Sequence, residues 1–588
     1  MIPVAFFLSL ACALQQVSAY SQFAFHAPTD RERSTFVNSP VDASNSGSEF
    51  YQLKWPIRNV AIIGAGVSGL LAYRELVEAG FDIRMFERDA IPGGVWHYTD
   101  ETPVPAPIPN EDPKIADYEP SLPPQGVPLP FERWYADHNA SISTAERWRR
   151  HRAPHGVWKS LTSNVPAPLM HFNGLPFPPE TPWSMPQDML VRYIRSAYSF
   201  FGINSNDENP RISYGTRVEL VEKRFDENGM ERGWRLTLKK FDRSGASSCK
   251  EVWWTEDFDA VVVATGNFNA PFMPSIPGLQ EWSQRFPGSV LHAREYRRPE
   301  MFTNKSVLMV GAGTSATGIS VDIHRFVKHK RNFLSFRRHA NSTTPLDFLR
   351  TLPHDVQIVP GIEQFHASNG TIQFSDGTTL SDIDHIVFST GYQYSFPFLP
   401  QYHNSSIPMN EEGPEDQPQP LVTDGSHYRS LYRDFIYIEE PTLGFMNMNL
   451  NTVTWTFGEY FAIALARVWS GTARLPSQKE MWRDYRKSVA DKGGYGKGVL
   501  FFDSGEYIRF FCGWLNSAAF EFGGKTVDGR PGDYLHILRT FMKAFFANPN
   551  PPKIPSGNSS QAFVATGGGG GSGDSDLLHL FDHLLSTY

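Results

Sequence analysis

Two glycine-rich loops, each lying between an apolar strand and a helical stretch, constrain the fold of this 588-residue chain more than any other feature. The first loop covers residues 64–69 behind an apolar run at 60–63, and the second covers residues 311–316 behind an apolar run at 307–310. A strand, a glycine-rich turn and a helix form the unit that binds a dinucleotide, with the pyrophosphate at the helix N-terminus. Two such units predict an α/β fold with two Rossmann-like dinucleotide-binding modules, and therefore electron transfer between two cofactors.

The first loop meets the steric needs of this unit residue by residue. Gly64 permits the tight turn, Gly66 lets the backbone approach the pyrophosphate, and Gly69 lets helix and strand pack closely. The next predicted strand, residues 82–86, ends at Glu87, about 20 residues past the glycines, where a ribose hydroxyl needs an acceptor. Because a carboxylate there would repel a 2′-phosphate, the first site is predicted to bind FAD or NAD and not NADP.

The second loop is followed by bases instead of an acid. Its predicted strand, residues 333–336, ends at Arg337 and Arg338, whose guanidinium groups can pair with a 2′-phosphate in bidentate fashion. The second site is therefore predicted to bind NADPH, while the alternative that both arginines are solvated surface charges stays open. The loop residues expected at this cofactor are Gly311, Gly313, Thr314, Ser315 and Ala316.

Further motifs occur in a fixed order around the two loops. The stretch from Phe286 to Tyr296 contains Gly288 and His292 in the pattern F-x-G-x3-H-x3-Y. The other motifs are Gly93-Gly94-Val95-Trp96, Leu161-Thr162-Ser163-Asn164-Val165-Pro166, Ala264-Thr265-Gly266, Phe388-Ser389-Thr390-Gly391-Tyr392 and Glu440-Pro441-Thr442-Leu443-Gly444-Phe445. Together they resemble the flavin-containing monooxygenases, class B flavoproteins whose single chain binds FAD and NADPH. The resemblance covers residues 56–485.

This resemblance implies cofactor contacts and a mechanism. It places at the cofactors Gly94, Val95, Trp96, Thr265, Gly266, Thr390 and Gly391. It implies a C4a-hydroperoxyflavin, formed from reduced FAD and O2, as the oxygenating species. By resemblance, the amide of Asn164 would face the flavin and keep the peroxide from leaving as H2O2; the alternative is that Asn164 caps a turn before Pro166. His292 is assigned to coupling of the two modules and not to proton transfer.

The order of the motifs predicts one module nested in the other. The FAD module is expected at residues 56–269 and 386–490, with the NADPH module inserted at 270–385. Alternating apolar and polar residues at 215–238 favour antiparallel strands beside the first sheet. The remaining predicted segments are a signal peptide at 1–19, a polar extension at 20–55, a C-terminal extension at 491–565, and a glycine-rich linker with an amphipathic helix at 566–588.

The expected activity is NADPH- and O2-dependent monooxygenation of a small organic molecule. The resemblance is to fungal-type members with secretory leaders, and it implies specialised metabolism: hydroxylation of an electron-rich aromatic polyketide, or oxidation of a soft nitrogen or sulfur. A Baeyer–Villiger ketone oxygenase is the alternative, although those enzymes usually carry tryptophan where this chain has Tyr296. A non-catalytic flavoprotein subunit is a third hypothesis, which two intact nucleotide loops disfavour.

Charge and cysteine content exclude other classes. A formal net charge of −8 gives no basic footprint for nucleic acid. The cysteines are Cys12, Cys249 and Cys512, with no CxxC pair. This argues against the disulfide reductases, since these need a redox-active dithiol beside the flavin. No His/Cys cluster has the spacing of a metal site, so no metal is expected.

The ends of the chain point to the secretory pathway. Residues 2–14 are apolar, and small residues at 17–19 fit a signal-peptidase site before Tyr20; an uncleaved membrane anchor is the alternative. Sequons of the N-x-Ser/Thr type agree with this location and lie at Asn139, Asn304, Asn341, Asn369, Asn404 and Asn558. The terminal helix has one apolar face and is expected to dock on its own domain, or to contact a protein partner or a membrane surface.

Overall fold

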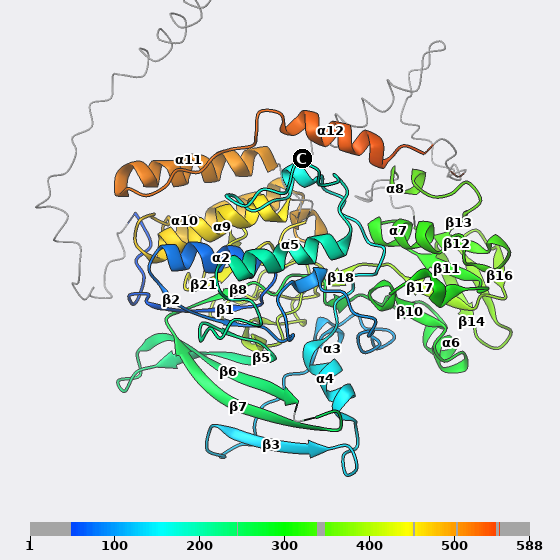
Figure 1. The fold of residues 1–588 in the computed structure, drawn as a ribbon, viewed down its shortest axis with the longest axis horizontal. Helices are drawn as coiled ribbons and strands as arrows, with labels where there is room; N and C mark the ends of the chain where they lie inside the picture. Colours follow the sequence, from blue (N-terminus) through cyan, green and yellow to red (C-terminus); the bar gives the residue numbers. More distant parts are fainter. Residues whose placement is uncertain are drawn as a thin grey trace, which may run out of the picture. The chain divides into compact units, whose positions relative to one another are not determined.

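The computed structural model describes residues 49–548 and 552, except 244, 338–346, 451–452 and 501–503 (Figure 1). The chain divides into two compact units, Met1–Ser48 and Glu49–Tyr588, and the described residues all belong to the second. The predicted signal peptide, most of the polar extension and the C-terminal amphipathic helix lie outside the described residues. The extension was predicted to reach residue 55, but Tyr51 N–H donates to Leu475 O (3.0 Å) and Trp55 is buried, so residues 49–55 belong to the first module.

A seven-stranded sheet forms the first module, with the strand order β19-β20-β21-β8-β1-β2-β4. Its strands are β1 (Asn59–Ile63), β2 (Asp82–Phe86), β4 (Ile212–Ser213), β8 (Ala260–Val263), β19 (Leu431–Tyr432), β20 (Ile436–Tyr437) and β21 (Leu443–Phe445). β1 pairs in parallel with β2 and β8, which confirms the strands predicted on either side of the first loop. Side chains alternate along β1, so Val60 and Ile62 enter one core while Ala61 enters another.

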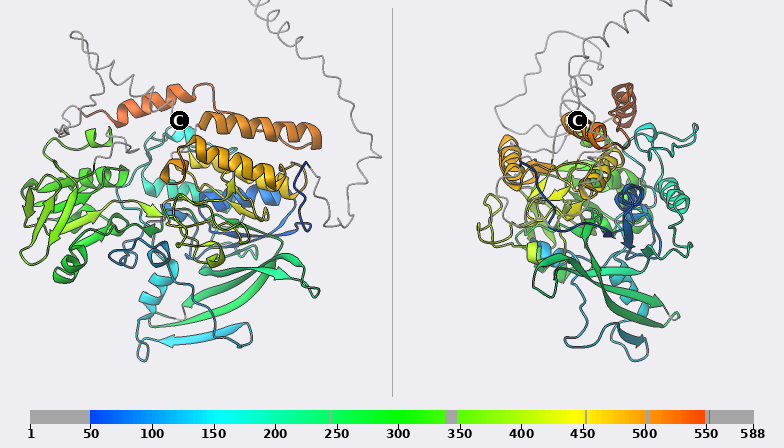
Figure 2. Two further views of the ribbon diagram at one scale, coloured as in Figure 1. Left: turned by 180° about the vertical axis from the view of Figure 1, so that it is seen from behind. Right: turned by 90° about the vertical axis from the view of Figure 1, so that its left-hand side faces the viewer.

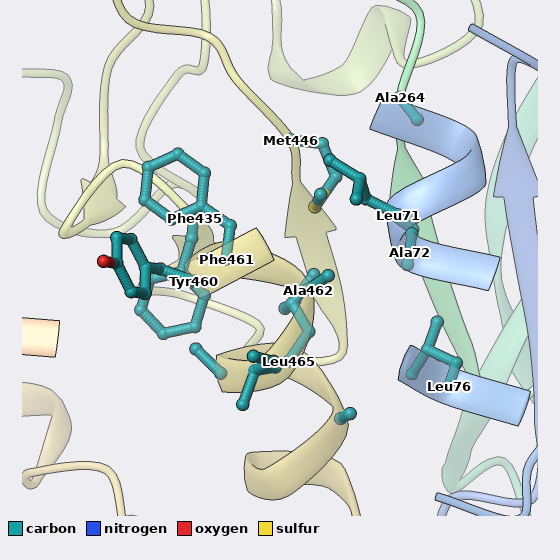
Figure 3. Packing of buried hydrophobic residues seen from close by; sticks show 14 of the residues in the cluster. Leu71, Ala72, Leu76, Ala264, Phe435, Met446, Tyr460, Phe461, Ala462 and Leu465 are labelled. Atoms are coloured by element: carbon teal, nitrogen blue, oxygen red, sulfur yellow. The ribbon is translucent and has the colours of Figure 1, made fainter. Parts of the chain in front are cut away.

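Helices bury the Val60 face of this sheet. α2 (Val67–Glu78), which begins in the first glycine-rich loop, packs along α9 (Thr454–Trp469), and Figure 3 shows Leu71 and Leu76 in the shared core with Leu465. Because replacing one such leucine with alanine costs about 2–5 kcal/mol, this packing fixes the position of α2 and of its loop. Further helices are α5 (Gln187–Phe200), α10 (Gln478–Asp491), α11 (Ser504–Phe522) and α12 (Tyr534–Phe545).

A five-stranded parallel sheet forms the second module, with the order β10-β17-β11-β12-β13. Its elements are β10 (Val290–His292), β11 (Val307–Val310), β12 (Asn332–Ser335), β13 (Gln357–Val359), β17 (His385–Phe388), α6 (Leu279–Arg285), α7 (Thr314–Ile323) and α8 (Asp347–Arg350). Strands β14 (Ile362–His366), β15 (Thr371–Phe374) and β16 (Thr379–Ser381) form a small antiparallel sheet. In the left view of Figure 2 these green elements group together at the left side.

One predicted boundary of the second module is wrong. The first module was expected to resume at residue 386, but residues 386–388 belong to β17, which hydrogen-bonds to β11 and β10. The reason is that the apolar run at 386–388 pairs in the parallel sheet of the second module, where it fills the place between β10 and β11. The second module therefore ends after Phe388.

An antiparallel sheet of the order β3-β7-β6-β5 lies beside the first module. Its strands are β3 (Phe131–Ala136), β5 (Thr216–Phe225), β6 (Glu231–Arg243) and β7 (Ser248–Phe258). The antiparallel strands predicted at 215–238 are thus confirmed as β5 and β6. The sequence between residues 99 and 152 adds the edge strand β3 together with α3 (Pro113–Ala116) and α4 (Thr144–Arg152).

Two crossovers carry the chain between the modules. They contain β9 (Ala270–Pro271) and β18 (Tyr392–Gln393), which pair with each other as antiparallel strands. Short 3-10 turns complete the structure at η2 (Gly94–Trp96), η3 (Ala167–Leu169), η4 (Ala293–Glu295), η5 (Pro299–Phe302), η6 (Lys328–Lys330), η7 (Pro400–Tyr402) and η8 (Lys497–Leu500). Within the described ranges, no helix combines the length and the apolar character that crossing a bilayer requires.

Candidate functional site

The first glycine-rich loop is closely packed against the backbone around it. Gly64 has φ +107°, and a Cβ atom there would lie 2.7 Å from Ala264 O. A Cβ on Gly69 would lie 2.0 Å from Gly64 O, and one on Gly94 would lie 2.9 Å from Gly66 Cα. Gly66 caps α2 without any side-chain hydrogen bond, so the first-turn N–H groups remain for an anion. The loop is therefore shaped for a pyrophosphate.

Glu87 stands at the end of β2, where the sequence places a ribose acceptor. Its side chain is buried, and its two carboxylate oxygens accept hydrogen bonds from Ala65 N–H (2.7 Å) and Asp89 N–H (2.8 Å). Burial raises the pKa of this carboxyl, while the two N–H donors oppose the rise. Each oxygen keeps a second lone pair for a ribose hydroxyl, so the ribose contact remains a prediction that this geometry permits.

The turn at residues 93–96 closes over the first loop. Gly93 N–H donates to Ala65 O (3.0 Å), and Gly94, Val95 and Trp96 form η2 beside it. The structure places the remaining predicted contacts of the first site, Thr265 and Gly266, in exposed positions that follow Ala264, the first residue past β8.

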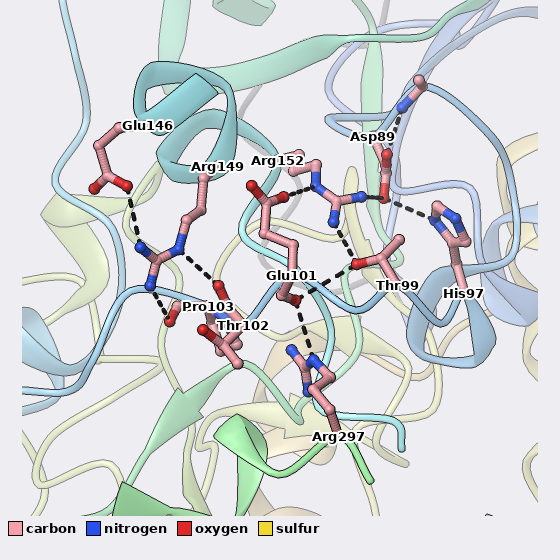
Figure 4. A network of polar contacts seen from close by, with 11 residues as sticks. Asp89, His97, Thr99, Glu101, Thr102, Pro103, Glu146, Arg149, Arg152 and Arg297 are labelled. Atoms are coloured by element: carbon pink, nitrogen blue, oxygen red, sulfur yellow. Dashed lines mark hydrogen bonds and ion pairs between the residues drawn. The ribbon is translucent and has the colours of Figure 1, made fainter. Parts of the chain in front are cut away.

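A buried ion network holds this turn in place (Figure 4). Asp89 accepts from His97 Nδ1 (2.9 Å) and from Arg152 Nη1 (3.3 Å), and Arg152 also binds Glu101 (3.0 Å). Burial works against ionisation of Asp89, but the hydrogen bond from His97 and the charge of Arg152 hold its pKa at about 2. The region after Glu87 is thereby tied to the inserted segment.

The second glycine-rich loop is more open. Gly311 has φ +122°, and a Cβ there would lie 2.5 Å from Ser389 O, so the tight turn of the first loop is repeated. Gly313, by contrast, has no heavy atom within 4 Å of an added Cβ. Gly313 caps α7, whose first residues are the predicted contacts Thr314 and Ser315. The last predicted contact of this loop is Ala316, which is buried in the core of the second module.

Arg337 lies two residues after the end of β12, one residue beyond Phe336, which matches Glu87 in the strand register. It is exposed and forms no ion pair or hydrogen bond with any other described residue. Its stem packs against Gly361, where an added Cβ would lie 2.6 Å from Arg337 Cγ. The guanidinium is thus free for an anionic ligand, and the 2′-phosphate contact stays a prediction. Arg338 lies outside the described residues.

Thr390 and Gly391 lie at the start of the second crossover. Thr390 Oγ1 donates to Phe272 O (2.5 Å), and Gly391 O accepts from Phe272 N–H (3.0 Å) and from His292 Nε2 (3.0 Å). Because His292 Nδ1 accepts from Arg294 N–H, the proton of the neutral ring is on Nε2. Burial, with the charge of Arg294, lowers the pKa of His292 to about 3. His292 therefore joins the second module to the start of the second crossover and stays neutral at neutral pH, while its role in coupling the two modules remains a prediction.

Asn164 lies where the two modules meet. Near it, Ser163 N–H donates to Met185 O (2.8 Å) in the first module, while Ser160 Oγ donates to Asp322 on α7. The side chain of Asn164 is exposed and makes no hydrogen bond to another described residue. The hydrogen bonds of the turn before Pro166 come from Ser163, so Asn164 does not cap that turn.

Two buried amides near the first site escaped the sequence analysis. Asn447 Nδ2 donates to Ser68 Oγ (2.8 Å) in the first turn of α2, while its Oδ1 has no partner. Both polar side-chain atoms of Asn449 are buried without a partner. An unpaired buried polar group costs about 1–3 kcal/mol, so a ligand with hydroxyl and amide edges fits here. Polar residues directly after the apolar strand β21 were the signal that could have revealed them.

The two described cysteines are free thiols. Cys249 is buried on β7 and Cys512 is half-buried on α11. They form no disulfide with each other, and neither stands in a dithiol motif. Among the described residues, no group of three or more His, Cys, Asp or Glu side chains could hold a metal ion.

The two sites differ in the chemistry of their donors. The first combines a glycine cradle, a buried carboxylate and unpaired buried amides, which fit FAD. The second combines an open glycine turn with an unpaired guanidinium, which fits NADPH. A single chain with both sites, joined by paired crossovers, has the architecture of a flavoprotein that is reduced by a nicotinamide cofactor.

Comparison with known proteins narrows this class. The model of the flavin-binding monooxygenase-like family matches residues 144–344 and 349–511, and an NAD(P)-binding Rossmann-like model matches residues 62–121. The chain belongs to the flavin-binding monooxygenase-like family. It is 49% identical over 496 residues to the flavin-containing monooxygenase iboF of Amanita muscaria, which covers 82% of this chain and 92% of that one. It is 30% identical over 484 residues to the flavin-containing monooxygenase ustF2 of Aspergillus flavus, covering 78% and 92%.

A solved structure shows the same fold. S-allyl-L-cysteine S-oxygenase from Allium sativum matches with a TM-score of 0.57 and 21% identity, covering 90% of this chain and 99% of that one. The protein is an FAD- and NADPH-dependent flavin monooxygenase, and the predicted family, fold, enzyme class and cofactors are confirmed.

Proposed function

We propose that this monooxygenase oxygenates a small organic molecule of specialised metabolism, either at an electron-rich aromatic carbon or at a soft nitrogen or sulfur. Bound FAD, once reduced, supplies the chemistry that activates O2. The protein's share is to hold NADPH beside the flavin, to exclude water and to retain the activated oxygen until substrate arrives. One observation carries the proposal: two nucleotide sites share a chain without a dithiol, so O2 is left as the acceptor of electrons from NADPH.

Asn164 is the residue that we propose retains the reacting oxygen. Its amide has no partner among the described residues, and its neighbours Ser163 and Ser160 bond to the first module and to Asp322 of the second, which supports this role. An amide is a neutral hydrogen-bond donor. A stronger acid at this place would hasten the loss of oxygen as H2O2.

Sulfur is the better supported of the proposed target atoms. A relative from Saccharomyces cerevisiae, 25% identical over 396 residues, is named a thiol-specific monooxygenase. The aromatic alternative rests on the resemblance to fungal-type members alone. The Baeyer–Villiger alternative would be favoured by a ketone substrate.

A product assay with three substrate classes tests the proposal. The purified holoenzyme receives NADPH and O2 together with a thioether, a polyphenol or a cyclic ketone, and products are identified by mass spectrometry. We expect a product heavier by one oxygen atom from the thioether or the polyphenol. A lactone from the ketone, with no other product, would overturn the proposed target atoms in favour of the Baeyer–Villiger reaction.

The role of Asn164 is tested by electron accounting. Asn164→Ala should retain FAD and oxidise NADPH, but it should release most of the electrons as H2O2 because the oxygen is no longer held. The matched control is Asn173→Ala, an exposed asparagine in the same stretch of chain. If Asn164→Ala yields as much product per NADPH as the parent enzyme, the assigned role is wrong.

We also propose that the protein enters the secretory pathway, as its apolar leader suggests. Three sequon asparagines, Asn139, Asn304 and Asn369, are exposed and so accessible to glycosylation. Sequencing the N-terminus of the secreted protein and measuring the mass lost on deglycosylation will test this. An intact Met1 together with an unchanged mass would reject it.

A further inference from the structure

The two crossovers form a shared ribbon. The first leaves β8 and passes through β9, and the second leaves β17 and passes through β18. β9 and β18 are antiparallel partners, with Gln393 opposite Ala270. Because the main chain passes between the two large sheets in this ribbon, its geometry helps to set how the NADPH module stands toward the flavin module.

An inserted strap, residues 99–117, lies across this ribbon. At its start, Thr99 and Glu101 are bound by Arg152 in the network of the first module (Figure 4). In its middle, Ala106 lies in an apolar core of the second module with Met273 and Leu308. Just past its end, Tyr118 Oη donates to Val218 O (2.9 Å) on β5. The strap thus leaves the first module, contacts the second and returns.

Asn110 is the point where the strap binds both crossovers. It is fully buried, and its Nδ2 donates to Pro271 O (2.9 Å) while its Oδ1 accepts from Met273 N–H (2.6 Å). Its own N–H donates to Met273 O (3.1 Å). Its carbonyl accepts from Gln393 Nε2 (2.6 Å), so one residue ties the first crossover to the second.

Two arginines, Arg294 and Arg88, bind the first crossover next to the residues that Asn110 contacts. Arg294 donates to Asn269 O (2.6 Å) in the first crossover and to Val104 O (2.6 Å) in the strap. Arg88, the residue after Glu87, donates to Asn269 Oδ1 (3.0 Å). The residues that follow the predicted ribose acceptor are therefore linked to the same crossover that Asn110 holds.

We propose that Asn110 is a positioning residue, which orients the NADPH module for hydride transfer to the flavin by fastening both crossovers to the strap. Its side chain is fully buried, and it acts through Pro271, Met273 and Gln393. A displacement of about 1 Å between reacting groups can cost about 100-fold in rate, so a loosened ribbon affects transfer before it affects binding.

Anaerobic flavin reduction tests this role directly. Asn110→Ala holoenzyme is mixed with NADPH in a stopped-flow instrument without O2 or organic substrate, and the loss of oxidised flavin absorbance is followed. We expect the limiting reduction rate to fall about 10- to 100-fold. The NADPH concentration that gives the half-maximal rate should change by less than about threefold, because binding of NADPH is not impaired. FAD content should match that of the parent. Since no substrate is added, this outcome is independent of the proposed substrate class.

Asn516→Ala is the matched control. Asn516 makes the same reciprocal pair of amide bonds, to Val527 O (3.0 Å) and from Val527 N–H (2.8 Å), but within the C-terminal helical segment. It should reduce at the parental rate even if its unfolding temperature falls. Equal slowing in both variants, or an unchanged rate in Asn110→Ala, would overturn the assignment.

A second variant covers the case in which Asn110→Ala fails to fold. Gln393→Leu removes only the bond from the second crossover to Asn110 and keeps the bonds to Pro271 and Met273. It should slow reduction in the same direction by a smaller factor. A parental rate in Gln393→Leu would show that fastening the second crossover is not required and would contradict the proposal.

Discussion

The two nucleotide sites begin from the same sequence pattern and end in different surroundings. Both open with a glycine of positive φ that lies against the chain after a neighbouring strand, Gly64 against Ala264 and Gly311 against Ser389. The turn at residues 93–96 packs against the backbone of the first loop. Around the second, Gly313 faces open space.

This difference agrees with the roles of the two cofactors. FAD must stay bound through each turnover, and a loop closed by a second turn and a buried ion network suits retention. NADPH must enter and NADP+ must leave, and an open loop with an exposed Arg337 suits exchange. Identical loop motifs therefore do not imply equal binding, because the segments that cover them decide how the ligand is enclosed.

Gly69→Ala should have the largest effect, because it breaks the enclosed site. The added Cβ would lie 2.0 Å from Gly64 O, and a backbone atom cannot move away cheaply. We expect a destabilisation of about 3 kcal/mol or more and loss of FAD. Flavin absorbance of the purified protein and thermal unfolding will measure this. A stable protein with parental FAD content would show that the first loop is less tightly packed than the structure indicates.

The second largest effect should come from acid, which protonates His292 and thereby destabilises its contact with Gly391. The pKa of His292 falls from 6.5 in the unfolded chain to about 3 in the folded one, so the unfolded state binds the extra proton between these values. The free energy of unfolding therefore decreases as the pH falls below 6.5. The decrease due to this one histidine is about 2 kcal/mol near pH 5.

His292→Gln removes this titration and retains a donor for Gly391 O. Plots of unfolding temperature against pH should therefore be flatter for His292→Gln than for the parent, and His171→Gln, on a half-buried histidine, serves as the control. Half-buried His155, whose pKa is also lowered to about 3, keeps part of the slope in every variant. If unfolding temperature depends on pH equally in the parent and in His292→Gln, then His292 does not contribute to the acid sensitivity of the fold.

Arg337→Ala should affect only the open site, and by a smaller amount. Loss of one charged hydrogen-bonding partner is expected to raise KM for NADPH about tenfold, while kcat/KM for NADH stays unchanged. Steady-state rates with the two nucleotides will measure the ratio. A parallel loss with NADH would mean that Arg337 does not contact the 2′-phosphate.

Gly313→Ala should have the smallest effect on stability. The added methyl meets no atom within 4 Å, so the free energy of unfolding should change by less than about 0.5 kcal/mol. FAD content should remain parental, and only KM for NADPH should rise by a few-fold. If Gly313→Ala destabilised the protein as much as we expect of Gly69→Ala, the second loop would not be more open than the first.

Much of the site could be predicted from local patterns. The strands before both loops and the strand before Glu87 follow from short motifs whose chemistry is local. The boundary at residue 386 was wrong because an apolar run does not show which sheet it joins. Asn447 and Asn449 were missed because their significance lies in the partners that they lack within the fold.

The sequence by itself determined that this chain has two dinucleotide-binding modules, an acid after one and an arginine pair after the other, and no dithiol. Those properties reside in residue type and spacing along the chain. The tertiary structure decided which loop is enclosed, that residues 99–117 cross both connections, and that Asn110 meets Met273 and Gln393. The physical reason is that burial and hydrogen-bond partners depend on segments up to hundreds of residues apart, whose approach is set by packing and not by local sequence.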